Sequence, residues 1–413
     1  MSAQPPRKET NDLSAHAGRL SFDPVRGALG LSVAMGMGRF FYTPALPLMV
    51  AALHWSSAPG AWIATLNYVG YFIGTLVIAR GWVQPNRFVY RLSLVVSTIG
   101  LAAVALTPNL IWQGSIRTIA GVASGLIFVC VTQRIPANSR RPRDGGVSYG
   151  GVGLGILVSG TIVLVAGGFA DWRQLWLICA AVSAVFSIIA WNWPIPARIA
   201  VHTPAQAAHP SEATDRSPTQ STDRTGAATP FETSRRRAMA FLSTGYFFQG
   251  GGYIIIGTYL VVLAEPVFGG TAAASTWMIA GIATAVSPLT WSAVAARIGT
   301  VKALTVCYSL QVFGALLAVF GETPIVLIIA AALFGFTFIG AVMMTIGVGT
   351  QMGVANASAK LTSWYSIGQI IGPAIVAAAL SDRIALAFIA SAIALAVAMA
   401  LTLIGVIAGN INR

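Results

Sequence analysis

Charged residues are scarce in this sequence, because Asp, Glu, Lys and Arg together make up only 9% of its 413 positions. An ordinary soluble domain has about a quarter of its residues charged, so this composition excludes a soluble globular protein. Hydrophobic residues make up 56% of the chain and stand in long runs. The scarcity of charge therefore predicts a chain that is embedded in a membrane.

Cysteine is also rare, and the three cysteines, Cys130, Cys179 and Cys307, all lie within apolar runs. Their odd number indicates neither a disulfide framework nor a metal site. The sequence also shows no nucleophile paired with a base, no cluster of metal-ligating residues and no phosphate-binding loop of the Walker type. We therefore predict that the chain is not an enzyme, uses no cofactor or metal, and does not itself hydrolyse ATP.

Acidic residues number only 12, against 25 Lys and Arg. The basic residues gather in every second loop between the apolar runs, and the intervening loops hold only Arg173 and Arg383. Because cytoplasmic loops retain Lys and Arg during insertion, this alternation predicts that both termini and the long central loop are cytoplasmic. The same rule accounts for the net charge of +13, so nucleic-acid binding is not expected.

The first 26 residues are polar and lack an apolar run that ends in a small-residue cleavage site. We therefore expect no cleaved signal peptide, and we expect the first membrane helix to direct insertion.

Twelve apolar runs approach or exceed the length of about 20 residues that a helix needs to cross a bilayer. They lie at 27–52, 60–79, 88–107, 110–131, 147–169, 175–193, 238–263, 276–296, 301–320, 324–349, 361–380 and 385–408. The stretch between the sixth and seventh runs is rich in Pro, Ser, Thr and charge, which is typical of a flexible linker. A faint internal repeat aligns Gly38-Arg39-Phe40 in the first run with Gly252-Tyr253-Ile254 in the seventh.

The sequence thus predicts an all-α membrane protein of twelve helices in two pseudo-symmetric six-helix bundles, an arrangement typical of transporters with a central binding site. The predicted parts are a cytoplasmic tail (1–26), the first bundle (27–195), a cytoplasmic linker (196–237), the second bundle (238–408) and a short tail (409–413).

Three motifs stand out in these runs. The first span contains Gly36-Met37-Gly38-Arg39-Phe40-Phe41-Tyr42-Thr43-Pro44-Ala45-Leu46-Pro47-Leu48-Met49, the fourth Arg117-x-x-x-Gly121-x-x-x-Gly125, and the eleventh Gly368-Gln369-Ile370-Ile371-Gly372-Pro373. With these motifs the sequence resembles the major facilitator superfamily, and more narrowly its YbfB/YjiJ-like branch. The resemblance implies the superfamily fold, alternating access, a bacterial inner membrane and a monomer. It also implies structural or gating roles for Gly121, Gly368, Gln369, Gly372 and Pro373.

The sequence departs from the superfamily pattern at the loops that usually contain Asp-Arg-x-Gly. The second of these loops reads Ala296-Arg297-Ile298-Gly299, with Ala in place of Asp, and the first has no recognisable version. Arg297 and Gly299 keep the expected gating positions, but the carboxylate that usually latches the two halves is missing.

Two arginines, Arg39 and Arg117, lie well inside apolar spans, where a charge costs roughly 2.5 to 3.5 kcal/mol on insertion scales. The 12 acidic residues all fall in tails, loops or helix ends, so no carboxylate stands mid-membrane to neutralise either one. One hypothesis is that a small organic anion binds both guanidinium groups. The alternative is a structural role, in packing or in hydrogen bonds to backbone carbonyls.

Polar and aromatic residues at comparable depth are predicted to complete a substrate cavity, since such groups are typical of small-molecule sites. They are Tyr42, Asn67, Tyr68 and Gln113 in the first half, and Tyr246, Gln249, Tyr253 and Gln311 in the second. The nearest candidates for proton coupling are His54 and Glu265, both at helix ends.

The predicted function is secondary active or facilitative transport of a small organic solute, with membrane lipid as the only other partner. Efflux of lipophilic drugs is the alternative within the transporter class, because the spans are rich in aromatic residues. A membrane enzyme or sensor fits less well, since the chain has no catalytic motif and no sizeable soluble domain.

Overall fold

The computed structural model describes residues 22–55, 57–135, 142–193, 230–379 and 383–409. Within these ranges the chain is helical and contains no strand. The first half contains α1 (Phe22–Leu31), the π-helical segment η1 (Ser32–Met37), α2 (Tyr42–Leu53), α3 (Ser57–Ala79), α4 (Arg87–Val104), α5 (Leu110–Thr132), α7 (Pro142–Ala166) and α8 (Trp172–Ala190). The second half contains α9 (Pro230–Phe268), the short 3₁₀ segment η2 (Gly270–Ala273), α10 (Ala274–Ile298), α11 (Thr300–Ala318), α12 (Pro324–Gln351), α13 (Ala357–Ala379) and α14 (Ile384–Ala408).

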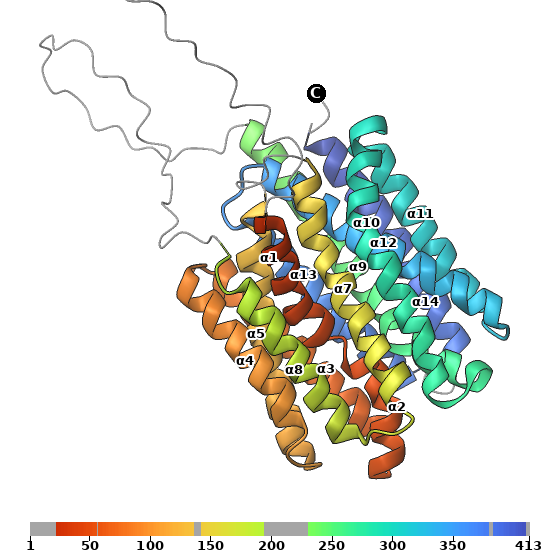
Figure 1. Cartoon of the computed structure of the whole chain (residues 1–413). Helices are drawn as coiled ribbons and strands as arrows, with labels where there is room; N and C mark the ends of the chain where they lie inside the picture. Colours follow the sequence, from red (N-terminus) through yellow and green to blue (C-terminus); the bar gives the residue numbers. More distant parts are fainter. Residues whose placement is uncertain (1–21, 56, 136–141, 194–229, 380–382, 410–413) are drawn as a thin grey trace, which may run out of the picture.

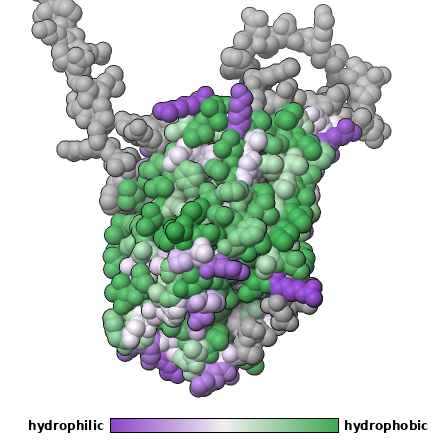
Figure 2. All heavy atoms as spheres, turned by 90° about the vertical axis from the view of Figure 1, so that its right-hand side faces the viewer, coloured by the Kyte–Doolittle hydropathy of each residue, from purple (hydrophilic) through white to green (hydrophobic). Residues whose placement is uncertain are grey.

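Ten of the described helices are long and apolar enough to cross a membrane. The other two predicted spans are the first, which is interrupted between α1 and α2, and α13, which contains Lys360 and Gln369. The two halves stand side by side, with the start of α1 and the end of α14 at the same end of the molecule (Figure 1). Apolar side chains cover most of the face shown in Figure 2, as expected for a surface in contact with lipid. The fold is therefore the predicted multi-pass bundle.

The two halves meet along α7 and α10, where the helix backbones touch. A Cβ atom added at Gly153 would lie 2.0 Å from the Ala285 nitrogen, and one added at Gly281 would lie 2.3 Å from the Leu157 nitrogen. Small residues allow such close approach between membrane helices. Gly150 and Gly153 of α7 thus pack one half against the other, whereas Gly151 and Gly155 pack against Ala28 and Gly36 within the first half.

Three polar contacts join the halves at the end where α13 begins. The hydroxyl groups of Thr132 and Ser358 lie 2.8 Å apart, and Ser363 donates a hydrogen bond of 3.3 Å to Thr75. The side-chain amide of Asn356 donates to the Ile78 carbonyl at 3.4 Å. These contacts close this end of the interface between α3, α5 and α13.

The seventh helix begins earlier than predicted. The linker predicted at 196–237 lies mostly outside the described residues, but its last part, from Pro230 onward, belongs to α9. Proline at a helix start and Glu232 in the first turn both favour helix initiation, because the proline needs no hydrogen-bond acceptor and the acid complements the helix dipole. Likewise, α1 begins at Phe22, inside the predicted tail.

Candidate functional site

The first predicted span is not one continuous helix. Its middle adopts π-helical geometry at η1 and then a turn at residues 38–41 before α2 begins. Gly38 donates to the carbonyl of Val33 and Phe40 to that of Met35, both five residues back. Pro44 has no N–H group, so the helical ladder loses a donor where α2 begins. The interruption leaves carbonyl groups in the middle of the bundle that need other partners.

Arg117 on α5 supplies those partners. Its Nη1 donates to the Gly38 carbonyl at 2.7 Å, and its Nη2 donates to the Arg39 carbonyl at 2.9 Å. The side chain is 1% exposed and also lies over the rings of Tyr42 and Trp176, at 5.1 and 5.6 Å from their centroids. The guanidinium group therefore replaces the backbone donors that the broken helix lacks.

Arg39 is buried as deeply but is bonded differently. Its side chain is 2% exposed, and its Nε, Nη1 and Nη2 atoms have no hydrogen-bond acceptor among the residues that the structure describes. Aromatic rings surround it instead, with the Cζ atom 4.5 Å from the centroid of Tyr71, 4.7 Å from Tyr68 and 5.3 Å from Phe40. Cation–π contacts offset part of the cost of burying the charge, but they leave its N–H donors free to bind an anion.

The two arginines share one small cavity at the boundary of the two halves. Arg39, Tyr42, Tyr68 and Arg117 line it from the first half, and Thr258 on α9 lines it from the second. The Tyr68 and Thr258 hydroxyl groups are 3.4 Å apart and connect the halves at this point. The cavity volume of about 10 Å³ is about the minimum for a single water molecule, so the site is occluded in this conformation.

Carboxylates stand away from this cavity in the described part of the chain. Asp144 and Glu232 lie in the first turns of α7 and α9, and Asp171 caps the start of α8. Glu265 lies in the last turn of α9, and Glu322 lies between α11 and α12. The described residues therefore place no anionic side chain at Arg39.

Asn67 and Gln113, both predicted to line the cavity, bond to backbone groups. The Asn67 amide donates to the Arg117 carbonyl at 2.8 Å, which ties α3 to α5 beside the cavity. Gln113 donates to the carbonyls of Val104 and Thr107, each at 2.7 Å, at the end of α4. The structure thus places Asn67 next to the arginines and uses Gln113 to close a helix end.

The predicted residues of the second half form an aromatic and amide layer. The Tyr253 ring stacks on Phe338 and Tyr365, with centroids 4.4 and 5.2 Å apart, and its hydroxyl accepts a hydrogen bond from Gln369. Tyr308 donates to Gln249 at 2.8 Å. Of the remaining pair, Tyr246 stacks on Tyr365, and Gln311 is buried with both amide atoms unbonded within the described residues. This layer is uncharged. It pairs Tyr253 with Gln369 and Tyr308 with Gln249, but it leaves the Tyr246 hydroxyl and the Gln249 amide nitrogen without partners among the described residues.

The two coupling candidates lie at helix ends. His54 is the exposed residue after α2 and has a left-handed backbone with φ of 52°. Glu265 is exposed near the end of α9. Neither residue lines the cavity that contains Arg39.

The predicted gating glycines bring helices into backbone contact. A Cβ atom at Gly121 would lie 2.2 Å from the Asn67 carbonyl oxygen, and one at Gly368 would lie 2.0 Å from that of Phe247. A Cβ at Gly372 would approach the Gly251 oxygen to 2.6 Å, and Pro373 lies one residue further within α13. Gly299 has a positive φ of 84° and ends α10, while Arg297 is exposed in its last turn.

Tyr71 and Thr258 belong to this site but were not predicted. Tyr71 lies three residues after Tyr68 and four after Asn67, so the spacing along α3 already places the three on one helix face. Thr258 has no comparable signal, because its position depends on how the two halves pack.

A family model described as "Uncharacterised MFS-type transporter YbfB" matches residues 31–405 of this chain. Among solved structures, a crystal structure of the nucleoside transporter NupG, a point mutant, matches with a TM-score of 0.61 and 15% sequence identity, covering 93% of this chain and 99% of that chain. At this identity the likeness shows the fold alone. Altogether 301 solved chains match, and a fold so widely shared does not specify a substrate. No curated protein matches the sequence.

Proposed function

The chain belongs to the YbfB-type family of major facilitator superfamily transporters, and from this premise we propose that it moves a small organic anion by alternating access. The family makes it a multi-pass membrane transporter and not an enzyme. The substrate class rests on one observation, which is the buried guanidinium group of Arg39 with no acceptor for its donors among the described residues.

Arg39 is suited to bind a carboxylate. A guanidinium group offers several N–H donors in a planar fork, which match the two oxygens of a carboxylate. An unneutralised charge in a membrane span is costly, and an anionic substrate would remove that cost on binding. Arg117 contributes indirectly, because its hydrogen bonds to the Gly38 and Arg39 carbonyls hold the turn that bears Arg39.

The size of the cavity supports alternating access. A space of about 10 Å³ admits no organic solute, so in this proposal the halves separate on one side before a substrate enters. The contacts between Thr132 and Ser358 and between Ser363 and Thr75 would open when the site faces that end. The transporter would work as a monomer, since one chain supplies both sides of the cavity.

We propose that the end where α9 and α13 begin is cytoplasmic. Arg235, Arg236, Arg237 and Lys360 all stand at this end, in agreement with the retention of basic residues on the cytoplasmic side. Both chain termini would then be cytoplasmic, and the host membrane would be a bacterial inner membrane, as is general for the family. His54 and Glu265 would stand at the outer end as candidate coupling residues.

The substrate proposal can be tested by thermal unfolding of the purified protein in detergent. A panel of carboxylates, sugars, amino acids, nucleosides and cationic drugs is screened against the wild type, Arg39→Gln and the matched variant Arg173→Gln. Binding at a hundredfold excess over Kd stabilises the folded state by about 2.7 kcal/mol. We expect carboxylates to stabilise the wild type and Arg173→Gln but not Arg39→Gln. Stabilisation of Arg39→Gln by the same carboxylates would contradict the proposal, and a response only to lipophilic drugs would favour drug efflux.

Alternating access can be tested separately with the double variant Thr132→Cys and Ser358→Cys. The two hydroxyl groups are 2.8 Å apart, so oxidation is expected to join the halves at this end. Uptake of the identified solute into proteoliposomes should stop after oxidation and recover after reduction. Full transport by a completely cross-linked sample would exclude a mechanism that requires this end to open.

A further inference from the structure

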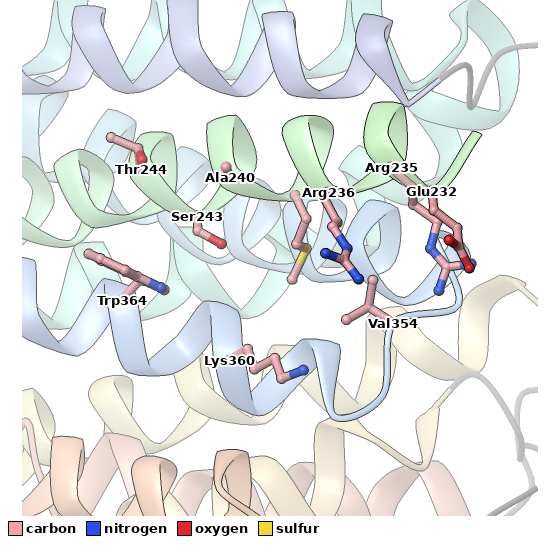
Figure 3. Close-up of a pocket in the computed structure, with 10 residues that line it drawn as sticks. Glu232, Arg235, Arg236, Ala240, Ser243, Thr244, Val354, Lys360 and Trp364 are labelled. Carbon is pink, nitrogen blue, oxygen red and sulfur yellow. The ribbon is translucent and has the colours of Figure 1, made fainter. Parts of the chain in front are cut away.

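A second cavity lies apart from Arg39, in a groove between α9 and α13 with a volume of about 620 Å³. From its side chains we propose that it binds an anionic phospholipid, with the phosphate between Arg236 and Lys360 and an acyl chain along Met239 and Trp364. Figure 3 shows the basic side chains at one end of the groove and Trp364, Ser243 and Thr244 farther along it.

The basic end of the groove has an excess of positive charge. Arg235, Arg236 and Lys360 line it together with one acid, Glu232. Arg235 donates to the Gly353 carbonyl at 3.0 Å, whereas the exposed side chains of Arg236 and Lys360 make no hydrogen bond within the described part of the chain. Figure 3 shows the side chains of Arg236 and Lys360 reaching into the gap between the helices. A phosphate group there would bind two flexible cations that the protein leaves available.

The groove continues from this charged end along both helices. Met239, Ala240 and Ser243 lie three, four and seven residues after Arg236, which places all of them on one face of α9. From Arg236 to Ser243 this face extends about 10 Å, at 1.5 Å per residue. On α13, Lys360 and Trp364 lie four residues apart and line the opposite side of the groove, with the charged residue first and the apolar residue after it. Charge and apolar surface are therefore arranged in the order of a headgroup followed by an acyl chain.

The groove opens toward lipid and not toward the other half of the protein. Trp364 is 49% exposed, and the stripe of α13 that begins at Lys360 continues with the exposed residues Ile371 and Ile375. A different face of α13, with Ser358 and Ser363, bonds to the first half. Tryptophan beside basic residues is typical of the membrane–water boundary. A phospholipid in the adjacent leaflet can therefore reach the groove from the side.

An anionic phospholipid fits better than a free phosphate because the groove offers both kinds of contact. Each Lys or Arg near a membrane surface favours an anionic lipid by about fivefold in affinity. A free phosphate would use the cations and leave Met239, Val354 and Trp364 without a partner. The groove thus combines a charge that selects the headgroup with a surface that holds the chain.

The test is native mass spectrometry of the full-length protein with phosphatidylglycerol, phosphatidylcholine and inorganic phosphate. The groove variants are Arg236→Gln, Lys360→Gln and their combination. Arg237→Gln is the matched control, because it removes the neighbouring charge of the same helix at a residue that does not line the groove. We expect phosphatidylglycerol to bind the wild type and the control with equal affinity. Its affinity should be about fivefold lower for each single groove variant and over tenfold lower for the double variant.

The proposal would be overturned if the double variant and the control bound phosphatidylglycerol equally. It would also be overturned if inorganic phosphate displaced phosphatidylglycerol at equal concentration. A second measurement, made on the wild type alone, tests the proposal even if a variant fails to fold. Phosphatidylglycerol with a photoreactive acyl chain should label peptides that contain Met239–Thr244 or Trp364. Labelling confined to other peptides would also contradict the assignment. Neither result depends on the transported solute, so the lipid site and the substrate site succeed or fail separately.

Discussion

The first span of the first half and α9 of the second half occupy corresponding positions, but they differ in backbone continuity and in the bonding of their central side chain. The repeat aligns Gly38-Arg39-Phe40 with Gly252-Tyr253-Ile254. In the first half the helix is interrupted at these residues, and the central side chain is charged and unbonded within the described residues. In the second half the helix is continuous, and the central side chain is an aromatic ring with a hydrogen-bond partner.

Local sequence accounts for part of this difference. Pro44 and Pro47 lie shortly after Arg39, and Pro44 cannot donate to a carbonyl in the preceding turn. In α9 the only internal proline is Pro266, more than three turns beyond Tyr253. Three consecutive glycines, Gly250 to Gly252, do not break α9, because they pack against neighbouring helices. The break thus follows from proline together with the donors that Arg117 supplies.

The comparison indicates that the two halves contribute different groups to the site. The first half positions a cation whose donors face no protein acceptor in the described chain, and the second half provides a wall of stacked rings from Tyr253, Phe338 and Tyr365. A charge that the protein does not satisfy is available to a ligand, whereas paired polar groups mainly stabilise the fold. Substitutions of the two arginines of the cavity are therefore expected to differ in their effect on stability.

The largest effect on stability is expected for Arg117→Met. The substitution removes the donors to the Gly38 and Arg39 carbonyls and leaves both buried without partners, at a cost of roughly 3 kcal/mol in folding free energy. Thermal unfolding in detergent should show a lower midpoint and a smaller yield of monodisperse protein. Arg117→Lys, which can reach only one carbonyl well, should be intermediate. An unchanged midpoint for Arg117→Met would show that the turn does not need these hydrogen bonds.

The next largest effects are expected at two glycines that allow close backbone contact, one with the first span and one with α9. A Cβ at Gly155 would lie 2.6 Å from the Cα of Gly36 in the first half, and one at Gly368 would lie 2.0 Å from the Phe247 oxygen in the second. Gly155→Val and Gly368→Val should each lower the unfolding free energy by about 1 to 3 kcal/mol, because the backbones must move apart. Gly168→Val is the control, since a Cβ there meets no atom within 4 Å. If the control were equally destabilised, close packing would not be the cause.

A smaller effect is expected for Tyr253→Phe in the second half. The ring and its stacking are kept, but Gln369 loses the acceptor for its side-chain amide, at a cost of about 1 kcal/mol. Thermal unfolding measures the loss, and the double variant with Gln369→Leu should recover most of it, since no unpaired donor is left. A larger loss in the double variant would mean that Gln369 has another essential partner.

Much of the fold was predictable from the sequence, because twelve apolar runs and the alternating positive charge are physical consequences of a membrane. The interruption of the first span was not predicted. The run at 27–52 has no charged residue except Arg39, and Pro44 and Pro47 indicate only a kink. The carbonyl partners of Arg117 come from residues nearly eighty positions earlier, and no local pattern reveals them.

The candidate site was predictable in outline but not in detail. The depth of each arginine in the membrane, counted along its helix from the helix start, predicted that Arg39 and Arg117 lie close together. Both line the same cavity. Depth does not determine rotation about the helix axis, so Gln113 was predicted in the cavity but closes the end of α4. The same limit applied to the groove between α9 and α13, since Arg236 and Lys360 lie more than a hundred residues apart and meet only through packing.

The smallest effect on stability is expected at the residue that matters most for binding. Arg39→Met breaks no hydrogen bond within the described chain and removes an uncompensated buried charge, which offsets the lost contacts with Tyr68 and Tyr71. The unfolding midpoint without ligand should therefore equal or exceed that of the wild type, in contrast to the identical substitution at Arg117. A marked loss of stability would show that Arg39, too, holds the turn in place. In that case the buried charge of the first half would serve the fold, as the hydrogen bond between Gln369 and Tyr253 does in the second half, and the anion proposal would lose its basis.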